Sequence, residues 1–378
     1  MKTKNLILHL SLIEGIGPST IQKFFGPQQT TAPEDLYTFG EKDLIHLFGL
    51  SPAAAFKVVQ GLLSRDLLEK ELVLIEKNNL RLMTIVDADY PELLKHIHMP
   101  PVVLYWQGKL LAHDENCLAV IGSRKANRYG YDAIDQIVPS LVHQGWVIVS
   151  GGALGADSMA YRATVEAGGR TIAVLGAGLL QPYPASNRRL FADILASDGA
   201  LVSPFPLMMQ ALPGNFPARN RIISGLSLGC LVVQAAQQSG ASITARFALD
   251  QGRDVFAVPG PIDDELSAGC HALIQQGAKL VTSALDIVQE YGQGVEAVSE
   301  EAMQRTIDEI LPSDDHGDYQ PKIQTPEHSI LRLCSKPCSM DDLAQETSLD
   351  LAALTTLLFD LQLEGKIAQN FMGLWERT

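Results

Sequence analysis

Two stretches of small residues in the middle of the chain could bind an anion. One is GSRK, which follows an apolar run and contains Gly122, Ser123, Arg124 and Lys125. The other is SGGALGAD, which follows a second apolar run and contains Gly151 and Gly152. Glycine lets backbone N–H groups approach a phosphate closely, and a helix that starts after such a loop adds a favourable field. We therefore predict an anion-binding crevice formed by these loops.

Arginines recur at the predicted starts of later helices, where they could reach the same crevice. The runs NRRL and RNRI supply Asn187, Arg188, Arg189, Arg219, Asn220 and Arg221. The planar guanidinium suits phosphate, and several cations suit a ligand with several phosphates, so single-stranded nucleic acid fits better than one nucleotide. Because a helix N-terminus disfavours cations, we expect an anionic ligand or a carboxylate to balance Arg219 and Arg221. Alternatively, Arg188 and Arg189 form a solvated helix face.

Sequence patterns for several common chemistries are missing. No Walker-type lysine follows the glycine-rich loops, no G-x-G-x-x-G follows the first apolar run, and no G-x-S-x-G elbow offers a serine nucleophile. Asp157 could be a catalytic carboxylate, but we favour a role as the cap of a helix that starts at Ser158. Cys334 and Cys338 have no second ligand pair nearby. We expect a binding protein that is not an enzyme and holds no metal and no cofactor.

The elements that position these loops follow a strand–helix–strand order. The runs 118–121 and 147–149 lack polar alternation, which is typical of strands covered on both faces. Between them a helical stripe is formed by Ile134, Ile137, Val138, Leu141 and Val142. Such a βαβ unit places both loops at the carboxyl edge of a parallel sheet. Further strands are predicted at 80–86, 102–106, 171–175, 201–202, 231–234, 255–258 and 279–281.

The composition agrees with a multidomain protein whose charge is unevenly distributed. The chain has 378 residues, 46% of them hydrophobic and 19% charged, with a net charge of −14. Residues 116–261 hold 11 Lys or Arg against 8 Asp or Glu, whereas residues 286–378 hold 6 against 18. The central part therefore remains compatible with nucleic acid. No apolar run is long enough to span a membrane, and no convincing signal peptide is present, so we expect a cytoplasmic protein.

Four segments are predicted. Residues 1–80 form a helical domain, in which a turn at 14–18 joins two helices in the manner of a SAM or helix-hairpin-helix module. Residues 81–290 form an α/β domain with an extended Rossmann-like parallel sheet, and residues 291–325 an acidic linker. Residues 326–378 form a winged-helix domain. Its third helix contains Asp350, Asp360 and Glu364 without any Lys or Arg, so we expect it to contact protein rather than DNA.

Taken together, these motifs resemble the DprA (Smf) family, the DNA-processing proteins of bacterial natural transformation. The matching stretches cover most of residues 90–281 in the family's order and include VIGSRKANRYG, VSGGALGADSMAY, FPARNRIISGLS, SGASITARFAL and GRDVFAVPG. The resemblance implies an extended Rossmann domain that binds single-stranded DNA and self-associates as a homodimer. It also implies delivery of RecA to DNA that arrives from a single-strand-binding protein, without established catalytic turnover.

The resemblance carries over the GSR, NRR and RNR residues as DNA contacts. Together with the glycine-rich loops, the expected contacts are Gly122, Ser123, Arg124, Lys125, Gly151, Gly152, Asn187, Arg188, Arg189, Arg219, Asn220, Arg221 and Ser242. Tyr161 stands where the family usually has His, and Pro204 and Gln234 stand where acidic residues are common. If those acids balance the RNR arginines, the crevice here is more positive.

Three function classes remain at this point. The first is a mediator that binds single-stranded DNA and loads RecA. The second is a Rossmann-like nucleotide hydrolase of the phosphoribohydrolase type, which would use Asp157. The third is a protein-interaction scaffold, which rests on the acidic C-terminal domain.

Overall fold

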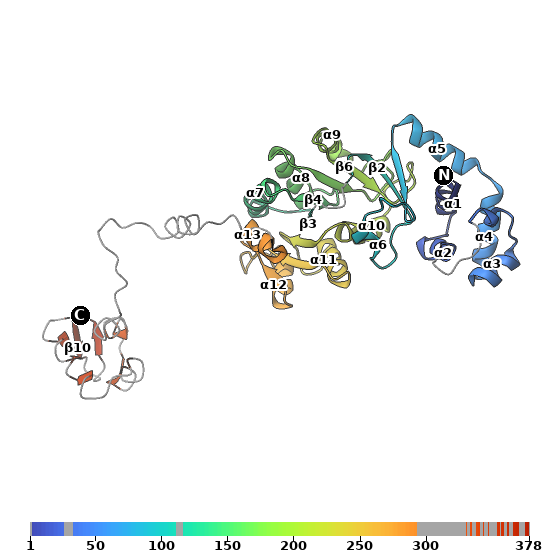
Figure 1. The fold of residues 1–378 in the computed structure, drawn as a ribbon. Helices are drawn as coiled ribbons and strands as arrows, with labels where there is room; N and C mark the ends of the chain where they lie inside the picture. Colours follow the sequence, from blue (N-terminus) through green and yellow to red (C-terminus); the bar gives the residue numbers. More distant parts are fainter. Residues whose placement is uncertain are drawn as a thin grey trace. The chain divides into compact units, whose positions relative to one another are not determined.

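The computed structural model describes residues 2–25, 33–110 and 116–292, and short pieces between residues 330 and 377. By their internal contacts the residues form two compact units, 1–297 and 298–378, which are treated separately below. Most of the first unit is an α/β domain with helices on both faces of one sheet (Figure 1). None of the described helices is long and apolar enough to cross a bilayer.

One nine-stranded sheet forms the centre of the first unit, with strand order β1-β2-β6-β5-β4-β3-β7-β8-β9. The strands are β1 (Arg81–Thr84), β2 (Val103–Gly108), β3 (Cys117–Ile121), β4 (Val147–Ser150), β5 (Thr171–Val174), β6 (Ala200–Ser203), β7 (Gly229–Val232), β8 (Asp254–Ala257) and β9 (Lys279–Leu280). From β6 to β9 all neighbours are parallel, as predicted. The segment before β3 extends the same sheet, because β2 pairs with β6 and β1 with β2, both antiparallel.

Strand β3 shows why the central strands read as continuous apolar runs. Its five residues are all buried. Leu118 and Val120 pack with the helices of one face, and Cys117, Ala119 and Ile121 pack with those of the other. A strand covered on both sides has no face left for polar residues. The sequence pattern therefore identified it correctly.

Thirteen α-helices were found among the described residues of the first unit. They are α1 (Lys2–Ser11), α2 (Pro18–Gln22), α3 (Glu41–Phe48), α4 (Pro52–Leu63), α5 (Asp66–Lys77), α6 (Glu92–Lys95), α7 (Arg128–His143), α8 (Ala156–Glu166), α9 (Arg188–Ala196), α10 (Asn215–Gly225), α11 (Gly240–Asp250), α12 (Ala268–Gln275) and α13 (Ala284–Val288). Short 3-10 turns lie at Pro33–Tyr37, Ala185–Asn187 and Gln289–Tyr291. The predicted stripe of α7 is buried against the sheet, with Val142 only partly buried.

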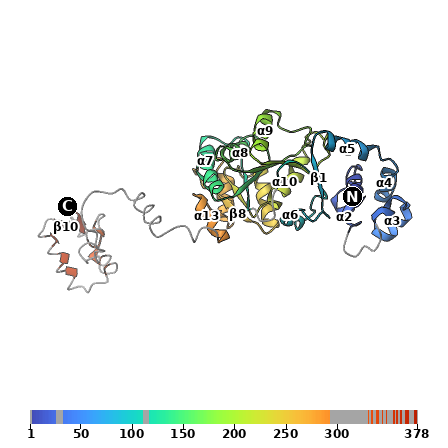
Figure 2. The same cartoon turned by 45° about the horizontal axis from the view of Figure 1, so that its top comes forward.

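The helices divide between the two faces of the sheet. Helices α7, α8 and α13 share a core with one face, whereas α6, α10, α11 and α12 share a core with the other. Figure 1 shows α7, α8 and α9 on the opposite side from α10, α11 and α12. Both views place helices α1–α5 beyond the β1 end of the sheet (Figures 1 and 2). There α1 packs against β1 and β2, so the N-terminal helices continue the packing of the sheet domain.

The second unit retains parts of the predicted winged helix. Strands β10 (Ile367–Gln369) and β11 (Trp375–Arg377) form an antiparallel ribbon, as predicted. Helical positions at 330, 340, 354 and 361 fall within the three expected helices, and Ile330, Leu343, Leu354 and Leu361 share one core. Asp350, Asp360 and Glu364, on which the prediction of protein contact rests, lie outside the described residues.

Candidate functional site

A pocket of about 620 Å³ opens at the carboxyl edge of the sheet, between β3 and β7. From β3 the chain proceeds to β4 on one side, and β7 lies on the other side, so this is the point where the strand order reverses. Open α/β sheets bind ligands at this topological switch point. We call it the switch-point pocket. Its lining comes from the end of β3 and the loop after it, from the segment after β4, from α10 and the loop before it, and from the start of α11. The lining residues are Ile121, Gly122, Ser123, Arg124, Ala153, Asp157, Pro213, Phe216, Pro217, Arg219, Asn220, Ile223, Ser239, Gly240, Ala241, Ile243 and Thr244.

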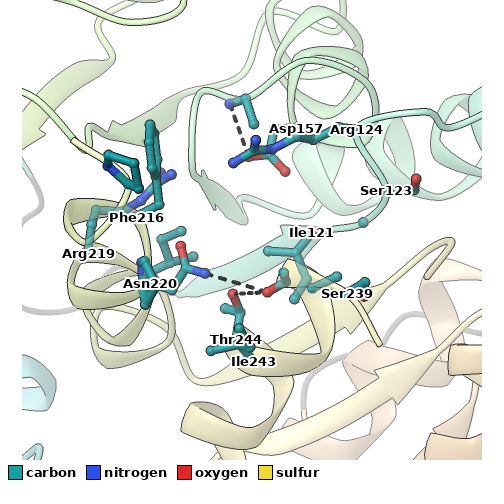
Figure 3. Close-up of a pocket in the computed structure, with 17 residues that line it drawn as sticks. Ile121, Ser123, Arg124, Asp157, Phe216, Arg219, Asn220, Ser239, Ile243 and Thr244 are labelled. Carbon is teal, nitrogen blue, oxygen red and sulfur yellow. Dashed lines mark hydrogen bonds between the residues drawn. The ribbon is translucent and has the colours of Figure 1, made fainter. Parts of the chain in front are cut away.

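Arg124 and Phe216 face each other across the mouth of the pocket (Figure 3). The guanidinium carbon of Arg124 lies 5.4 Å from the centre of the Phe216 ring, a cation–π contact worth about 0.5–1 kcal/mol at an exposed position. Arg124 is exposed and Phe216 is half-buried. The pair therefore offers a cation and an aromatic surface side by side, which is what a nucleotide's phosphate and base require.

The start of helix α11 forms the opposite wall. The hydroxyl of Ser239 caps this helix by accepting the N–H of Ser242 at 3.2 Å. Gly240 and Ala241, whose N–H groups belong to the first turn, both line the pocket. Figure 3 shows Asn220 and Thr244 donating side-chain hydrogen bonds toward the Gly240 carbonyl, at 3.5 and 3.3 Å. This wall provides a helix N-terminus that favours an anion.

Gln234 stabilises the GSRK loop through hydrogen bonds to Ser123 and Asn127. Its carbonyl accepts the N–H of Ser123 at 2.6 Å, and its side-chain amide both accepts the N–H of Asn127 and donates to the Asn127 side chain. Gln234 is buried, and Asn127 caps helix α7. The residue that departs from the family pattern therefore orders the loop that carries Arg124. Its side-chain hydrogen bonds go to Asn127, and not to the RNR arginines that its acidic counterpart was expected to balance.

The SGGALGAD loop is held by buried side chains, contrary to its predicted use as a phosphate cradle. The N–H groups of Gly151 and Ala153 donate to Asp157 Oδ2 at 3.1 and 3.2 Å, and the N–H of Gly152 donates to the Tyr161 hydroxyl at 3.0 Å. The Asn187 amide donates to the Gly152 carbonyl at 3.0 Å. These glycines allow close packing under the loop, and their N–H groups are already engaged.

Asp157 differs from the predicted cap. Helix α8 begins at Ala156, so Asp157 lies within its first turn, and its carboxylate turns back to the preceding loop instead of capping from outside. Burial raises the pKa of Asp157, while the charge of Arg219 and the two N–H donors oppose this effect. The carboxylate is the acceptor that the loop requires, which accounts for an acidic residue at this position.

The two arginines of the RNR run, Arg219 and Arg221, also make hydrogen bonds that stabilise the fold. Helix α10 begins at Asn215, so Arg219 and Arg221 lie beyond its first turn, where the predicted conflict with the helix dipole does not arise. Arg219 is buried and donates to the carbonyls of Gly151 and Val174. Arg221 donates to the carbonyl of Met99. Burial lowers the pKa of both guanidinium groups, and Asp157 offsets this for Arg219.

The expected contact residues therefore divide into two sets. Those that line the switch-point pocket are Gly122, Ser123, Arg124, Arg219 and Asn220. Those that do not line it are Lys125, Gly151, Gly152, Asn187, Arg188, Arg189, Arg221 and Ser242. Arg188 and Arg189 are exposed in the first turn of α9, directly after the buried Asn187. The sequence reasoning missed Phe216, although it stands in the quoted run FPARNR, and the capping role of Ser239.

The described residues contain no cluster of three or more His, Cys, Asp or Glu that could hold a metal ion. The sulfurs of Cys334 and Cys338 approach to 3.7 Å and are not joined by a disulfide.

Fold and pocket together define a doubly wound α/β protein with a pocket at the switch point of its sheet, where this class of fold binds ligands. Residues 81–292 match the family described as DNA recombination-mediator protein A, and residues 324–370 match the DprA winged helix domain. The chain belongs to this family. Its role is therefore that of a DNA-processing recombination mediator, as the resemblance implied.

Known relatives agree with this assignment. The DNA processing protein DprA of Streptococcus pneumoniae is 44% identical over 208 residues, which cover 55% of this chain and 73% of that protein. The X-ray structure of DprA from the same species superimposes with a TM-score of 0.64 at 34% identity, covering 76% of this chain and 97% of that one. A Helicobacter pylori DNA processing protein A, whose structure was described for its single-stranded DNA binding mode, gives a TM-score of 0.50 at 27% identity over 56% of this chain and 95% of its own.

Proposed function

We propose that this protein binds single-stranded DNA in the switch-point pocket and, in the cytoplasm, loads RecA onto that DNA during natural transformation. The observation that carries the proposal is the Arg124–Phe216 pair, because an exposed cation beside a half-buried aromatic ring suits a phosphate and an unstacked base. A volume of about 620 Å³ admits individual nucleotides but is far too small for a duplex. The single-stranded DNA binding described for the Helicobacter relative supports the same ligand class.

Charge reversal at Arg124 tests the pocket. We expect Arg124→Glu to weaken binding of an oligo-dT strand at least about tenfold, because a phosphate then meets a carboxylate instead of a guanidinium. Fluorescence anisotropy at two salt concentrations measures the loss. Arg162→Glu provides a matched control, because Arg162 is exposed on α8 and does not line the pocket. Equal affinity of the Arg124 variant and the wild type would contradict the proposed site.

Recombinase loading needs a separate measurement. We propose that the protein is a homodimer, and sedimentation velocity measures this oligomeric state. The homodimer delivers RecA to DNA that is covered by a single-strand-binding protein. RecA ATPase activity on such covered strands should begin with a shorter lag when the full chain is added, and Arg124→Glu should abolish this effect. An unchanged lag with the wild-type chain would exclude the loading role while leaving DNA binding intact.

We further propose that the protein works without catalytic turnover. The competing nucleotide hydrolase needs Asp157 as a reactive carboxylate, yet its Oδ2 already accepts two backbone N–H groups and the side chain is buried. Release of base from nucleoside monophosphates is the direct assay. Saturable turnover that is lost in Asp157→Asn would establish the hydrolase instead.

A further inference from the structure

Four buried polar side chains contact the loop that follows β4, and two of them, Asp157 and Arg219, also line the switch-point pocket. Asp157 and Tyr161 come from α8, Asn187 precedes α9, and Arg219 comes from the middle of α10. Their exposed fractions are 8%, 0%, 4% and 3%. We call them the anchor cluster. Ionised and polar side chains are rarely buried unless they are paired, so we expect each of the four to have a hydrogen-bond partner in the fold.

What the anchor cluster holds is the backbone of residues 151–153. Each of the three N–H groups donates to Asp157 or Tyr161, and Asn187 and Arg219 donate to the carbonyls. A Cβ atom added at Gly151 would lie 2.7 Å from Asp157 Oδ2, so the glycine is needed for this close approach. A phosphate could bind these N–H groups only after the cluster had been broken.

Arg219 connects this loop to helix α10. Its guanidinium bridges the Gly151 carbonyl after β4 and the Val174 carbonyl at the end of β5, beside the opposite charge of Asp157. Its Nε is buried without a hydrogen-bond partner. The side chain reaches from the pocket lining into the protein, where its two hydrogen bonds fix α10 against the carboxyl ends of two strands.

Phe216 lies three residues before Arg219, on the same side of the helix. A Cβ atom added at Gly176 would come within 2.9 Å of the Phe216 ring, so the ring packs closely over the segment after β5. The same ring meets the Arg124 guanidinium at 5.4 Å. A change in the position of α10 at Arg219 would therefore move the aromatic half of the Arg124–Phe216 pair.

We propose that Arg219 is a positioning residue: with Asp157, Tyr161 and Asn187 it ties α10 to the strand ends and sets Phe216 beside Arg124. Of the two cations that line the pocket, Arg124 then meets the phosphate and Arg219 does not touch DNA. This inference rests on the proposed binding of single-stranded DNA and corrects the assignment of the RNR arginine as a DNA contact.

The salt dependence of binding separates the two roles. Each phosphate contact to a single strand contributes about 0.7 to the slope of log affinity against log salt. Arg124→Ala should reduce that slope by about 0.7. Arg219→Met should lower oligo-dT affinity about tenfold, the size of one lost base stack, and keep the wild-type slope. A slope that falls in Arg219→Met as it does in Arg124→Ala would overturn the proposal.

A second variant at the same position keeps the proposal testable if Arg219→Met fails to fold. Arg219→Lys keeps a positive charge next to Asp157, but its side chain is one bond shorter than the path to Arg219 Nη1, the atom that donates to both carbonyls, so the ammonium should reach them less well. It should show a smaller affinity loss, again with an unchanged slope. In the Phe216→Ala background, neither Arg219 variant should cause further loss, because the residue through which Arg219 acts is already gone. Additive losses would contradict the positioning role.

Hydrogen exchange tests the positioning role of Arg219 in the absence of DNA. Amide exchange in residues 215–220 should accelerate in Arg219→Met and Asp157→Asn, and should stay at the wild-type rate in Arg124→Ala. Wild-type protein that fails to bind oligo-dT would overturn the proposed function, whereas unchanged exchange in Arg219→Met would overturn this inference on its own.

Discussion

Individual residues in this site act through specific hydrogen-bond partners outside their own turn of helix or strand. The Tyr161 hydroxyl accepts the N–H of Gly152, and Gln234 pairs with Asn127, 107 residues away. Both stand at positions where the resemblance led us to expect another residue type. In each case the side chain present accepts a backbone N–H, from Gly152 for Tyr161 and from Asn127 for Gln234.

The Tyr161 contact yields a prediction about stability. Tyr161→Phe removes the acceptor and leaves the Gly152 N–H buried without a partner, which should lower the free energy of unfolding by about 1–3 kcal/mol. Urea denaturation measures the change. Tyr131→Phe serves as the control, because Tyr131 is exposed on α7 and should lose no more than about 0.5 kcal/mol. A Tyr161 variant as stable as the control would show that the hydroxyl is dispensable.

At the scale of elements, helix α5 stabilises the loop that leads into α10. Glu71 of α5 is buried, and its carboxylate accepts the N–H of Leu207 at 2.7 Å. Leu207 belongs to the segment between β6 and α10, which also supplies Pro213 to the pocket wall. The N-terminal helices are therefore linked to the site through one hydrogen bond, although none of their residues lines it.

The pH dependence of stability should report this link. Burial raises the pKa of Glu71 above its ordinary value of 4.5, while the Leu207 N–H opposes the shift. A raised pKa means that the folded state favours the protonated acid, so the stabilising contribution is present at low pH and is lost as pH rises through the folded pKa. Glu71→Gln keeps an oxygen acceptor and cannot ionise. It should become progressively more stable relative to the wild type as pH increases from 4 to 8.

Urea midpoints at a series of pH values test the Glu71 prediction. Glu69→Gln on the exposed side of the same helix is the matched control, and its urea midpoint should change with pH in the same way as that of the wild type. If the Glu71 and Glu69 variants gave the same profile, the buried carboxylate could not be the source of the pH dependence.

For the whole molecule, acidic residues are concentrated toward the C-terminus. Residues 116–261 carry a small positive excess and contribute the lining of the pocket, whereas the second unit, residues 298–378, holds 15 acidic residues against 6 basic ones. An acidic segment adds nothing to phosphate binding. This distribution favours DNA binding by the first unit and protein contact by the second.

Deletion of residues 320–378 tests this division of roles. Affinity for oligo-dT should survive the deletion, because every residue that lines the pocket remains. The same anisotropy titration as above measures it, and stimulation of RecA ATPase in parallel shows whether a protein contact has been lost. Loss of DNA binding in the shortened chain would refute the assignment of the second unit to protein contact.

The sequence by itself determined the strands, the parallel sheet and the family. Apolar runs such as 118–121 identify strands buried on both faces, because that pattern depends on neighbouring residues alone. The parallel order then places the following loops at one edge. The position of the crevice was therefore predictable to the level of loops.

The tertiary structure alone decided which residues of those loops are exposed in the pocket and which are engaged by the fold. Arg124 and Arg219 look alike in sequence, yet one is exposed beside Phe216 and the other is enclosed by carbonyls 68 and 45 residues away. Likewise, the N–H groups of Gly151 and Gly152 were expected to be free and are engaged by α8. A side chain's partner depends on distances between segments remote in sequence, which no local pattern encodes.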